Sequence, residues 1–173
     1  MKTYVLGFLF LGLTNLTIAQ NDLAVVSTTN QNAYLNSTSS KTVLNSEYIK
    51  TVDHVDQSKK MSLMQNLVAN YDIKTTDIYR SNSEGSYTID FKEGENAISA
   101  IFDNKGSLIS CEENYQAIKL PYAISSKLVK DYPNWSIKAV ECEINYVKDS
   151  ERTIVYKVAI KNGQKSKNIS IKV

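Results

Sequence analysis

The sequence predicts an α+β domain in which two tandem units, each a helix followed by antiparallel strands, form one sheet of about seven strands with the helices on one face. Three observations support this prediction. Residues 120–135 carry apolar side chains at helical spacing, and residues 136–173 contain three β-rich segments. A similar helical pattern lies 61 positions earlier, where Leu63 corresponds to Ile124.

The helix predicted within residues 120–135 is bounded by proline at both ends. Pro121 suits a first helical position, where no amide donor is needed, and Pro133 ends the run. The apolar residues of this stretch recur on one face: Leu120, Ile124, Leu128, Val129 and Tyr132. We expect this stripe to be buried against the strands that follow it.

Residues 1–19 have the features of a secretory signal peptide. A lysine precedes an apolar run, and the small residues up to Ala19 fit a cleavage site after that residue. A membrane-spanning helix needs about 20 apolar residues, whereas Asn15, Thr17 and Gln20 interrupt this run. We therefore expect an exported protein, in the periplasm or outside the cell, without stable membrane insertion once the signal is removed.

Residues 20–60 are expected to form a polar, flexible leader. Serine, threonine, asparagine and glutamine predominate up to about residue 46, and such a composition buries too little apolar surface to fold alone. The last part contains apolar residues at helical spacing: Leu44, Tyr48, Val52 and Val55. They fit a short helix that docks on the domain, but residues 43–52 also fit an extended arm.

The predicted domain covers residues 61–173, and its first unit covers residues 61–116. Leu63, Leu67, Val68 and Tyr71 mark the helical face, and residues 72–80 are expected to form a loop and a strand. Three further strands are predicted at residues 87–91, 97–102 and 107–115. A hairpin turn at residues 103–106 is expected to join the last two.

The second unit, residues 117–173, is predicted to repeat this order with longer loops. The shift of 61 positions places Leu67 on Leu128 and Val68 on Val129. Residues 154–158 correspond loosely to the strand at 87–91, and residues 168–173 to the strand at 97–102. The sequence ends where a fourth strand of this unit would follow, which gives about seven strands in total.

One face of the predicted sheet is expected to be covered by the helices and the other to be open. Alternation places Thr88, Asp90 and Lys157 on the open face. Three tyrosines are further candidates for a binding surface, because a broad rigid ring suits recognition: Tyr79, Tyr115 and Tyr146.

Charge and histidine content exclude several classes of function. Removal of Lys2 with the signal peptide leaves 19 of the 20 basic residues against 18 acidic ones, and this balance gives no basis for nucleic-acid binding. The single histidine, His54, lies in the leader without partners at ligand spacing. We therefore expect no metal site, no cofactor and no histidine-dependent nucleophile.

Pairs of carboxylates are the remaining route to catalysis, since a glycosidase needs only two acids. The candidates lie on predicted strands: Glu112, Glu113, Glu141 and Glu143. Adjacent strand residues point to opposite faces, and no cluster of sugar-stacking aromatic residues accompanies them. We interpret them as solvent-facing strand charges and expect no enzymatic activity.

Cys111 and Cys142 are the only cysteines of a chain that we expect to be exported, which leaves two interpretations open. A disulfide would join the two units and close a loop of about 30 residues, a stabilisation of roughly 3 to 4 kcal/mol. Alternatively, the two residues are separate buried thiols.

Several short motifs occur in the predicted domain: Phe-Asp-Asn-Lys-Gly-Ser-Leu at residues 102–108, the pair Glu112 and Glu113, and the Leu-Pro and Tyr-Pro pairs that end at Pro121 and Pro133. Together they resemble the motifs of the PepSY-like domain of secreted Bacteroidetes proteins. The resemblance covers about residues 61–173, although the second unit lacks the Phe-Asp-x-x-Gly hairpin. The family is described as similar to the β-lactamase inhibitory protein, so the resemblance implies two tandem copies and a binding or inhibitory role.

The sequence thus predicts an exported, non-enzymatic protein-binding domain that acts through its open sheet face, for example as an inhibitor of a peptidase or another enzyme. The alternative is a module that senses a small ligand or envelope stress. The expected partner is a protein or peptide, and we expect the chain to be a monomer.

Overall fold

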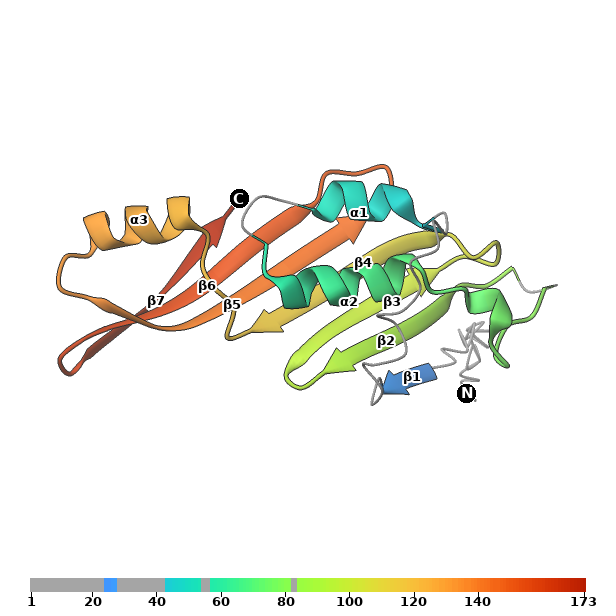
Figure 1. The fold of residues 1–173 in the computed structure, drawn as a ribbon, viewed down its shortest axis with the longest axis horizontal. Helices are drawn as coiled ribbons and strands as arrows, with labels where there is room; N and C mark the ends of the chain where they lie inside the picture. The colour runs from blue at the N-terminus through green and yellow to red at the C-terminus, as the bar shows by residue number, and fades with distance from the viewer. Residues whose placement is uncertain (1–23, 28–42, 54–56, 82–83) are drawn as a thin grey trace, which may run out of the picture.

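The computed structural model describes residues 24–27, 43–53, 57–81 and 84–173. Within them the fold is α+β, with three α-helices on one face of a sheet that contains six antiparallel strands (Figure 1). The predicted signal peptide, much of the leader and His54 lie outside the described residues. No helix in the described part of the chain is long and apolar enough to cross a membrane.

The six antiparallel strands follow one another in chain order across the sheet, so each pairs with the next. Their bounds are β2 Tyr87–Glu93, β3 Asn96–Phe102, β4 Leu108–Gln116, β5 Ser136–Val147, β6 Thr153–Asn162 and β7 Lys165–Lys172. A short strand from the leader, β1 Ala24–Ser27, pairs in parallel with β2 at one edge. The other edge is β7.

The strand predicted within residues 72–80 is not formed. A 3-10 helix, Ile73–Thr75, occupies this position, and Asp72 caps it by accepting a hydrogen bond from the amide of Lys74. The hydroxyls of Thr75 and Thr76 also bond to carbonyls of the same turn. These local bonds compete with strand pairing, so the predicted domain contributes six strands to the sheet.

Two helices cover the middle of the sheet. They are α1 Ser46–Val52 and α2 Lys59–Ala69, and in Figure 1 they lie side by side over the strands. Helix α2 lies over β3, and α1 lies over β5. Tyr48 and Val52 of α1 are completely buried. The prediction of a short docked helix is therefore confirmed, and the extended arm is wrong.

The alternation predicted for the strands is confirmed on the helix side of the sheet. The buried side chains of β2 and β6 are those that the sequence predicted: Tyr87, Ile89, Phe91, Ile154, Tyr156, Val158 and Ile160. Together with apolar residues of the helices they form one core.

The third helix, α3 Tyr122–Asp131, confirms the predicted element but only part of its buried stripe. Leu128 is buried, whereas Val129 is 65% exposed. Leu128 and Val129 point about 100° apart because they are neighbours on a helix. Helix α3 lies beyond α1 and α2, on the far half of strands β5, β6 and β7 (Figure 1). The helix therefore buries a narrower stripe than α2 does, in which Val68 is fully buried.

Candidate functional site

The sheet face opposite the helices is the largest candidate surface, because no helix of the described chain covers it (Figure 1). Its side chains alternate with the buried ones along each strand. Of the three residues predicted there, Thr88 and Asp90 are partly exposed in β2 and Lys157 is exposed in β6.

Strand pairing arranges the open face in rows of directly opposed residues. One row crosses five strands: Asp90, Ser99, Glu112, Asn145 and Thr153. The next row runs to the edge strand: Lys92, Ala97, Asn114, Glu143, Val155 and Lys172. The face is therefore predominantly polar.

Charge divides this face into two regions. Acidic residues occur on β2, β4 and β5, whereas β6 and β7 contain lysines and no acidic residue. Lys157 lies opposite Glu141 and forms an ion pair with Glu143 at the boundary. Because both partners are substantially exposed, this pair contributes at most about 1 kcal/mol to stability.

The three predicted surface tyrosines do not lie on the open face. Tyr115 and Tyr146 are 0% and 3% exposed, because each falls on the helix-side phase of its strand. The Tyr79 ring packs against Tyr87, and its hydroxyl donates a 2.9 Å hydrogen bond to the carbonyl of Asn104. The predicted surface position is therefore wrong for Tyr115 and Tyr146. Tyr79 is partly buried against the core on the helix side.

A buried carboxylate, Glu113, lies on the helix side of β4 and joins three elements. It accepts hydrogen bonds from Tyr48 of α1 at 2.9 Å, from Gln65 of α2 at 2.7 Å and from Tyr115 of β4 at 2.6 Å. Gln57 donates in turn to the side chain of Gln65. We call Tyr48, Gln65, Glu113 and Tyr115 the Glu113 cluster.

Burial governs the ionisation of the cluster. It raises the pKa of Glu113, although the three hydrogen bonds oppose this effect. Burial is also the largest cause of the raised pKa of Tyr48 and of Tyr115, and the adjacent carboxylate adds to it. Both phenols are therefore neutral donors. The three donors of the cluster all point at the Glu113 carboxyl, and Gln57 donates to Gln65 from outside it.

The sequence interpretation of Glu113 as a solvent-facing charge is wrong, since only 3% of this residue is exposed. Its neighbour Glu112, which points to the other face, is exposed as expected. The available signal was the phase of β4, because Cys111, Glu113 and Tyr115 alternate like a buried set. A carboxylate is rarely buried, which favoured the opposite interpretation.

Of the two interpretations left open for the cysteines, the structure shows separate buried thiols and no disulfide. They lie on neighbouring strands, but Cys111 is opposite Tyr146 and Cys142 is opposite Tyr115. Four positions of offset separate them by about 13 Å along the strands, far beyond the range of about 4.4 to 6.8 Å between bridged Cα atoms. Burial raises the pKa of both thiols, to about 12 for Cys142.

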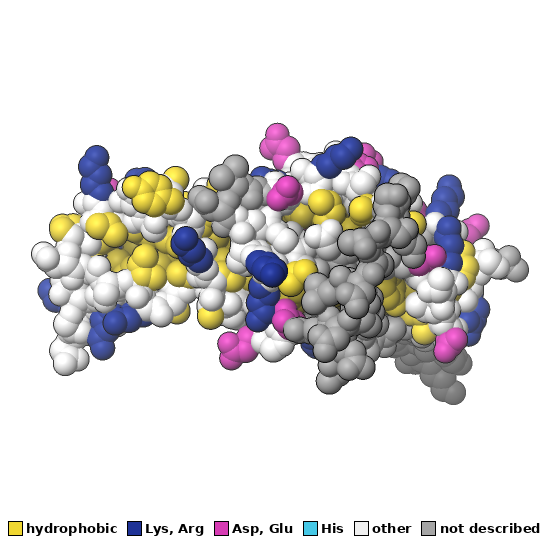
Figure 2. Space-filling model, viewed as in Figure 1, with side chains coloured by type: hydrophobic (Ala, Val, Ile, Leu, Met, Phe, Trp, Pro, Cys, Tyr) yellow, Lys and Arg dark blue, Asp and Glu magenta, His cyan; other side chains and the backbone are white. Residues whose placement is uncertain are grey.

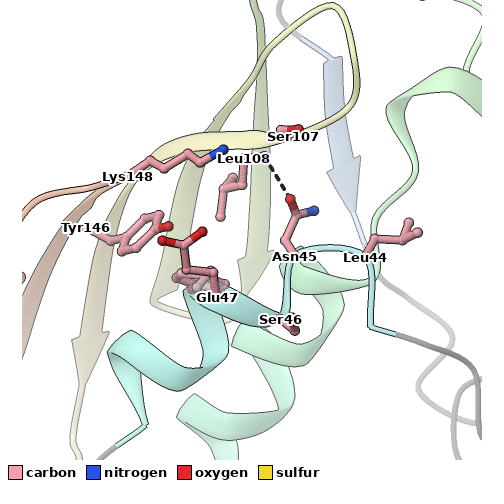
Figure 3. A pocket seen from close by; sticks show the side chains of 9 residues that line it. Leu44, Asn45, Ser46, Glu47, Ser107, Leu108, Tyr146 and Lys148 are labelled. Carbon is pink, nitrogen blue, oxygen red and sulfur yellow. Dashed lines mark hydrogen bonds between the residues drawn. The ribbon is translucent and has the colours of Figure 1, made fainter.

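A small hollow of about 180 Å³ lies between the start of α1 and the adjoining ends of β4 and β5 (Figure 3). Asn45, Glu47, Tyr146 and Lys148 line it, and Asn45 accepts a 2.8 Å hydrogen bond from the amide of Leu108. Ligand sites usually measure about 300 to 1,000 Å³. The hollow is therefore too small to enclose a drug-sized molecule.

Among the residues that the structure describes, no three metal-ligating side chains come together. No family model matches the chain, and no curated protein or solved structure is significantly similar to it. The resemblance to PepSY-like domains therefore stays a prediction.

Proposed function

We propose that this chain is an exported, non-enzymatic domain that binds a protein partner through the open face of its sheet. The observation that supports the proposal is the contrast between the two faces. Helices α1, α2 and α3 all lie on one side of the sheet, whereas the other side presents rows of partly exposed polar residues.

The dimensions of the open face suit a protein better than a small molecule. Six strands spaced about 4.8 Å apart, with about nine residues each at about 3.3 Å, outline roughly 700 Å². A stable protein interface buries about 800 Å² of accessible surface on each side. Protruding side chains make the accessible area of the face larger than its flat outline. The area of the open face is therefore comparable to that of a stable interface.

The placement of the acids supports a non-enzymatic role. Glu113 is enclosed and fully hydrogen-bonded, and Glu112 lies on the opposite face of the same strand. Hydrolysis by paired carboxylates needs two acids that converge on one substrate bond. The row arrangement instead spreads acids over neighbouring strands, which suits a basic patch on a partner.

We also propose that the fold consists of two tandem units related to the PepSY-like pattern. The order of elements supports this: α2 is followed by β2, β3 and β4, and α3 is followed by β5, β6 and β7. The leader helix α1 stands outside this repeat and packs with α2 and β5. An inhibitory role against a peptidase or another enzyme is the form of binding that the resemblance implies.

A photo-crosslinking residue at Ser99, in the middle of the open face, tests the proposed binding surface. The matched control is the same residue at Ser126, which is exposed on α3 on the other side of the sheet. In envelope and culture-medium fractions of the exporting cells, we expect a specific protein adduct from position 99 only. Equal adducts at both positions, or none at position 99, would contradict the proposal.

A small-ligand sensor is the second candidate, and the hollow beside Asn45 and Glu47 is the observation that favours it. A ligand that binds the folded state must raise its melting temperature by mass action. Thermal shifts with a panel of metabolites and short peptides test this. A shift that Glu47→Gln removes and Glu112→Lys leaves unchanged would favour the sensor over the open-face binder.

A further inference from the structure

The edge strand β7 has an unused pairing side. It pairs only with β6, and no other part of the described chain forms backbone hydrogen bonds to its outer side. Apart from Ile169 and Ile171, which are partly exposed, its residues are exposed. Such an edge can accept a further strand.

The register shows which backbone groups of β7 point outward. The amide of Val173 donates to the carbonyl of Ile154, so these two residues form a hydrogen-bonded pair. Hydrogen-bonded pairs alternate with non-bonded ones along an antiparallel ladder, and this ladder has no register shift. The residues with outward N–H and C=O groups are therefore Ser166, Asn168, Ser170 and Lys172.

The side chains of β7 distinguish its two faces at this edge. Ile169 and Ile171 point to the helix side, where they pack only partly into the core. Figure 2 shows hydrophobic side chains at the surface in this half of the molecule, near α3, with basic side chains among them. An added strand would cover both isoleucines if it placed apolar residues on the helix side.

Lysine is the only charged residue type on the last two strands. Lys157, Lys161 and Lys172 lie on the open side of β6 and β7, and Lys157 is paired with Glu143. Lys165 and Lys167 lie on the helix side, and neither strand contains an acidic residue. Lys167 donates a 3.0 Å hydrogen bond to the Tyr132 hydroxyl. Its Nζ atom lies 4.7 Å from the centroid of the Tyr132 ring. A nearby acidic strand would therefore be attracted, and a basic one repelled.

The same lysines argue against a second copy of the chain as the occupant, since pairing of two β7 strands would bring like charges together. A flat anionic membrane would meet the lysines but leave the outward N–H and C=O groups of β7 without strand partners. Only an extended peptide uses the backbone groups, the isoleucines and the charges together.

We propose that β7 binds an extended protein segment as an additional strand, and that this segment alternates apolar residues on the helix side with acidic residues on the open side. The edge is separate from the open face, so this proposal does not depend on the function proposed above.

Ser170→Pro provides the test, because it removes one outward N–H and leaves the bonds between β6 and β7 in place. Ser170→Ala is the matched control, since it shortens the same side chain and keeps the amide. The probe is a short peptide that alternates valine and glutamate. We expect the wild type and Ser170→Ala to bind it equally and Ser170→Pro to bind it at least about tenfold more weakly, a change of about 1.4 kcal/mol.

Amide hydrogen exchange in the unsubstituted chain gives an independent result that does not require the proline variant to fold. With the peptide bound, we expect new protection at the outward amides of Ser166, Asn168, Ser170 and Lys172. A peptide that alternates valine and lysine should produce none, and salt should weaken the valine–glutamate complex.

Four outcomes would overturn the proposal. They are a lack of binding, binding of both peptides alike, binding without protection of the outward amides, and protection that rises with chain concentration when no peptide is present. The last outcome would identify a second copy of the chain as the occupant. Binding of vesicles rich in anionic lipid, with no peptide binding, would identify a membrane surface instead.

Discussion

The phenol hydroxyl of Tyr48 in α1 donates a 2.9 Å hydrogen bond to the buried carboxylate of Glu113 in β4, although the two residues are 65 positions apart in sequence. This bond attaches the helix of the predicted leader to the centre of the sheet. Gln65 of α2 bonds to the same carboxylate. The folded unit therefore begins before residue 61, and α1 is part of its core.

Tyr48→Phe should reduce the free energy of unfolding by about 1 to 3 kcal/mol, because the buried carboxyl of Glu113 loses a hydrogen-bond donor while the ring still fills its site. Urea unfolding followed by circular dichroism measures this change. Tyr146→Phe is the matched control: its ring packs edge-on against Tyr48 at 5.1 Å, and no bond joins it to Glu113. We expect the control to change stability by less than about 0.5 kcal/mol, and equal losses would contradict this role of Tyr48.

Glu113 should make stability depend on pH in a defined direction. Burial raises its folded-state pKa above the value of about 4.3 in an unfolded chain. A raised pKa gives stability that is present below the unfolded pKa and is lost as pH rises through the folded one. The free energy of unfolding of the wild type, minus that of Glu113→Gln, should therefore fall as pH rises from about 4.

The other titratable groups near Glu113 should not contribute to this pH dependence of stability. Tyr48, Tyr115, Cys111 and Cys142 all have pKa values raised chiefly by burial, so they stay neutral over the same pH range. Urea unfolding of both proteins at a series of pH values provides the difference. A difference that is flat or that increases with pH would show that Glu113 is not destabilised in its ionised form.

The strands could be predicted because alternating apolar and polar residues indicate a strand with one buried face. Ile89 in β2 and Val158 in β6 are buried as their spacing indicated. The segment at residues 72–80 could not be assigned in this way, since side-chain bonds to the local backbone decide its conformation. The parallel pairing of β1 with β2 joins segments far apart in sequence, and no local pattern indicates it.

The candidate site was predicted in part. Thr88, Asp90 and Lys157 follow the strand phase and lie on the open face. Tyr115 and Tyr146 are buried because the phase of a strand, and not the residue type, decides which face a side chain occupies. The Glu113 cluster needs the packing of α1 and α2 against β4, and that tertiary arrangement cannot be read from spacing within one strand.

The thiols of Cys111 and Cys142 should be unreactive in the folded protein. Both are buried and unpaired with each other, and their raised pKa values keep the reactive thiolate scarce. A thiol-reactive dye should label both residues in urea and neither in buffer over the same time. A reductant should leave the urea unfolding midpoint unchanged, whereas a lower midpoint with reductant would reveal a disulfide.

Adjacent residues of α3 should differ sharply in their effect on stability. Leu128 is 5% exposed and Val129 is 65% exposed, although both belong to the stripe that the sequence predicted to be buried. Leu128→Ala should lower the free energy of unfolding by about 2 to 3 kcal/mol through lost burial and a cavity. Val129→Ala should change it by less than about 0.5 kcal/mol, and alanine favours the helix in both cases. Urea unfolding of the two variants separates them, and similar losses would mean that the outer side of α3 is covered in solution.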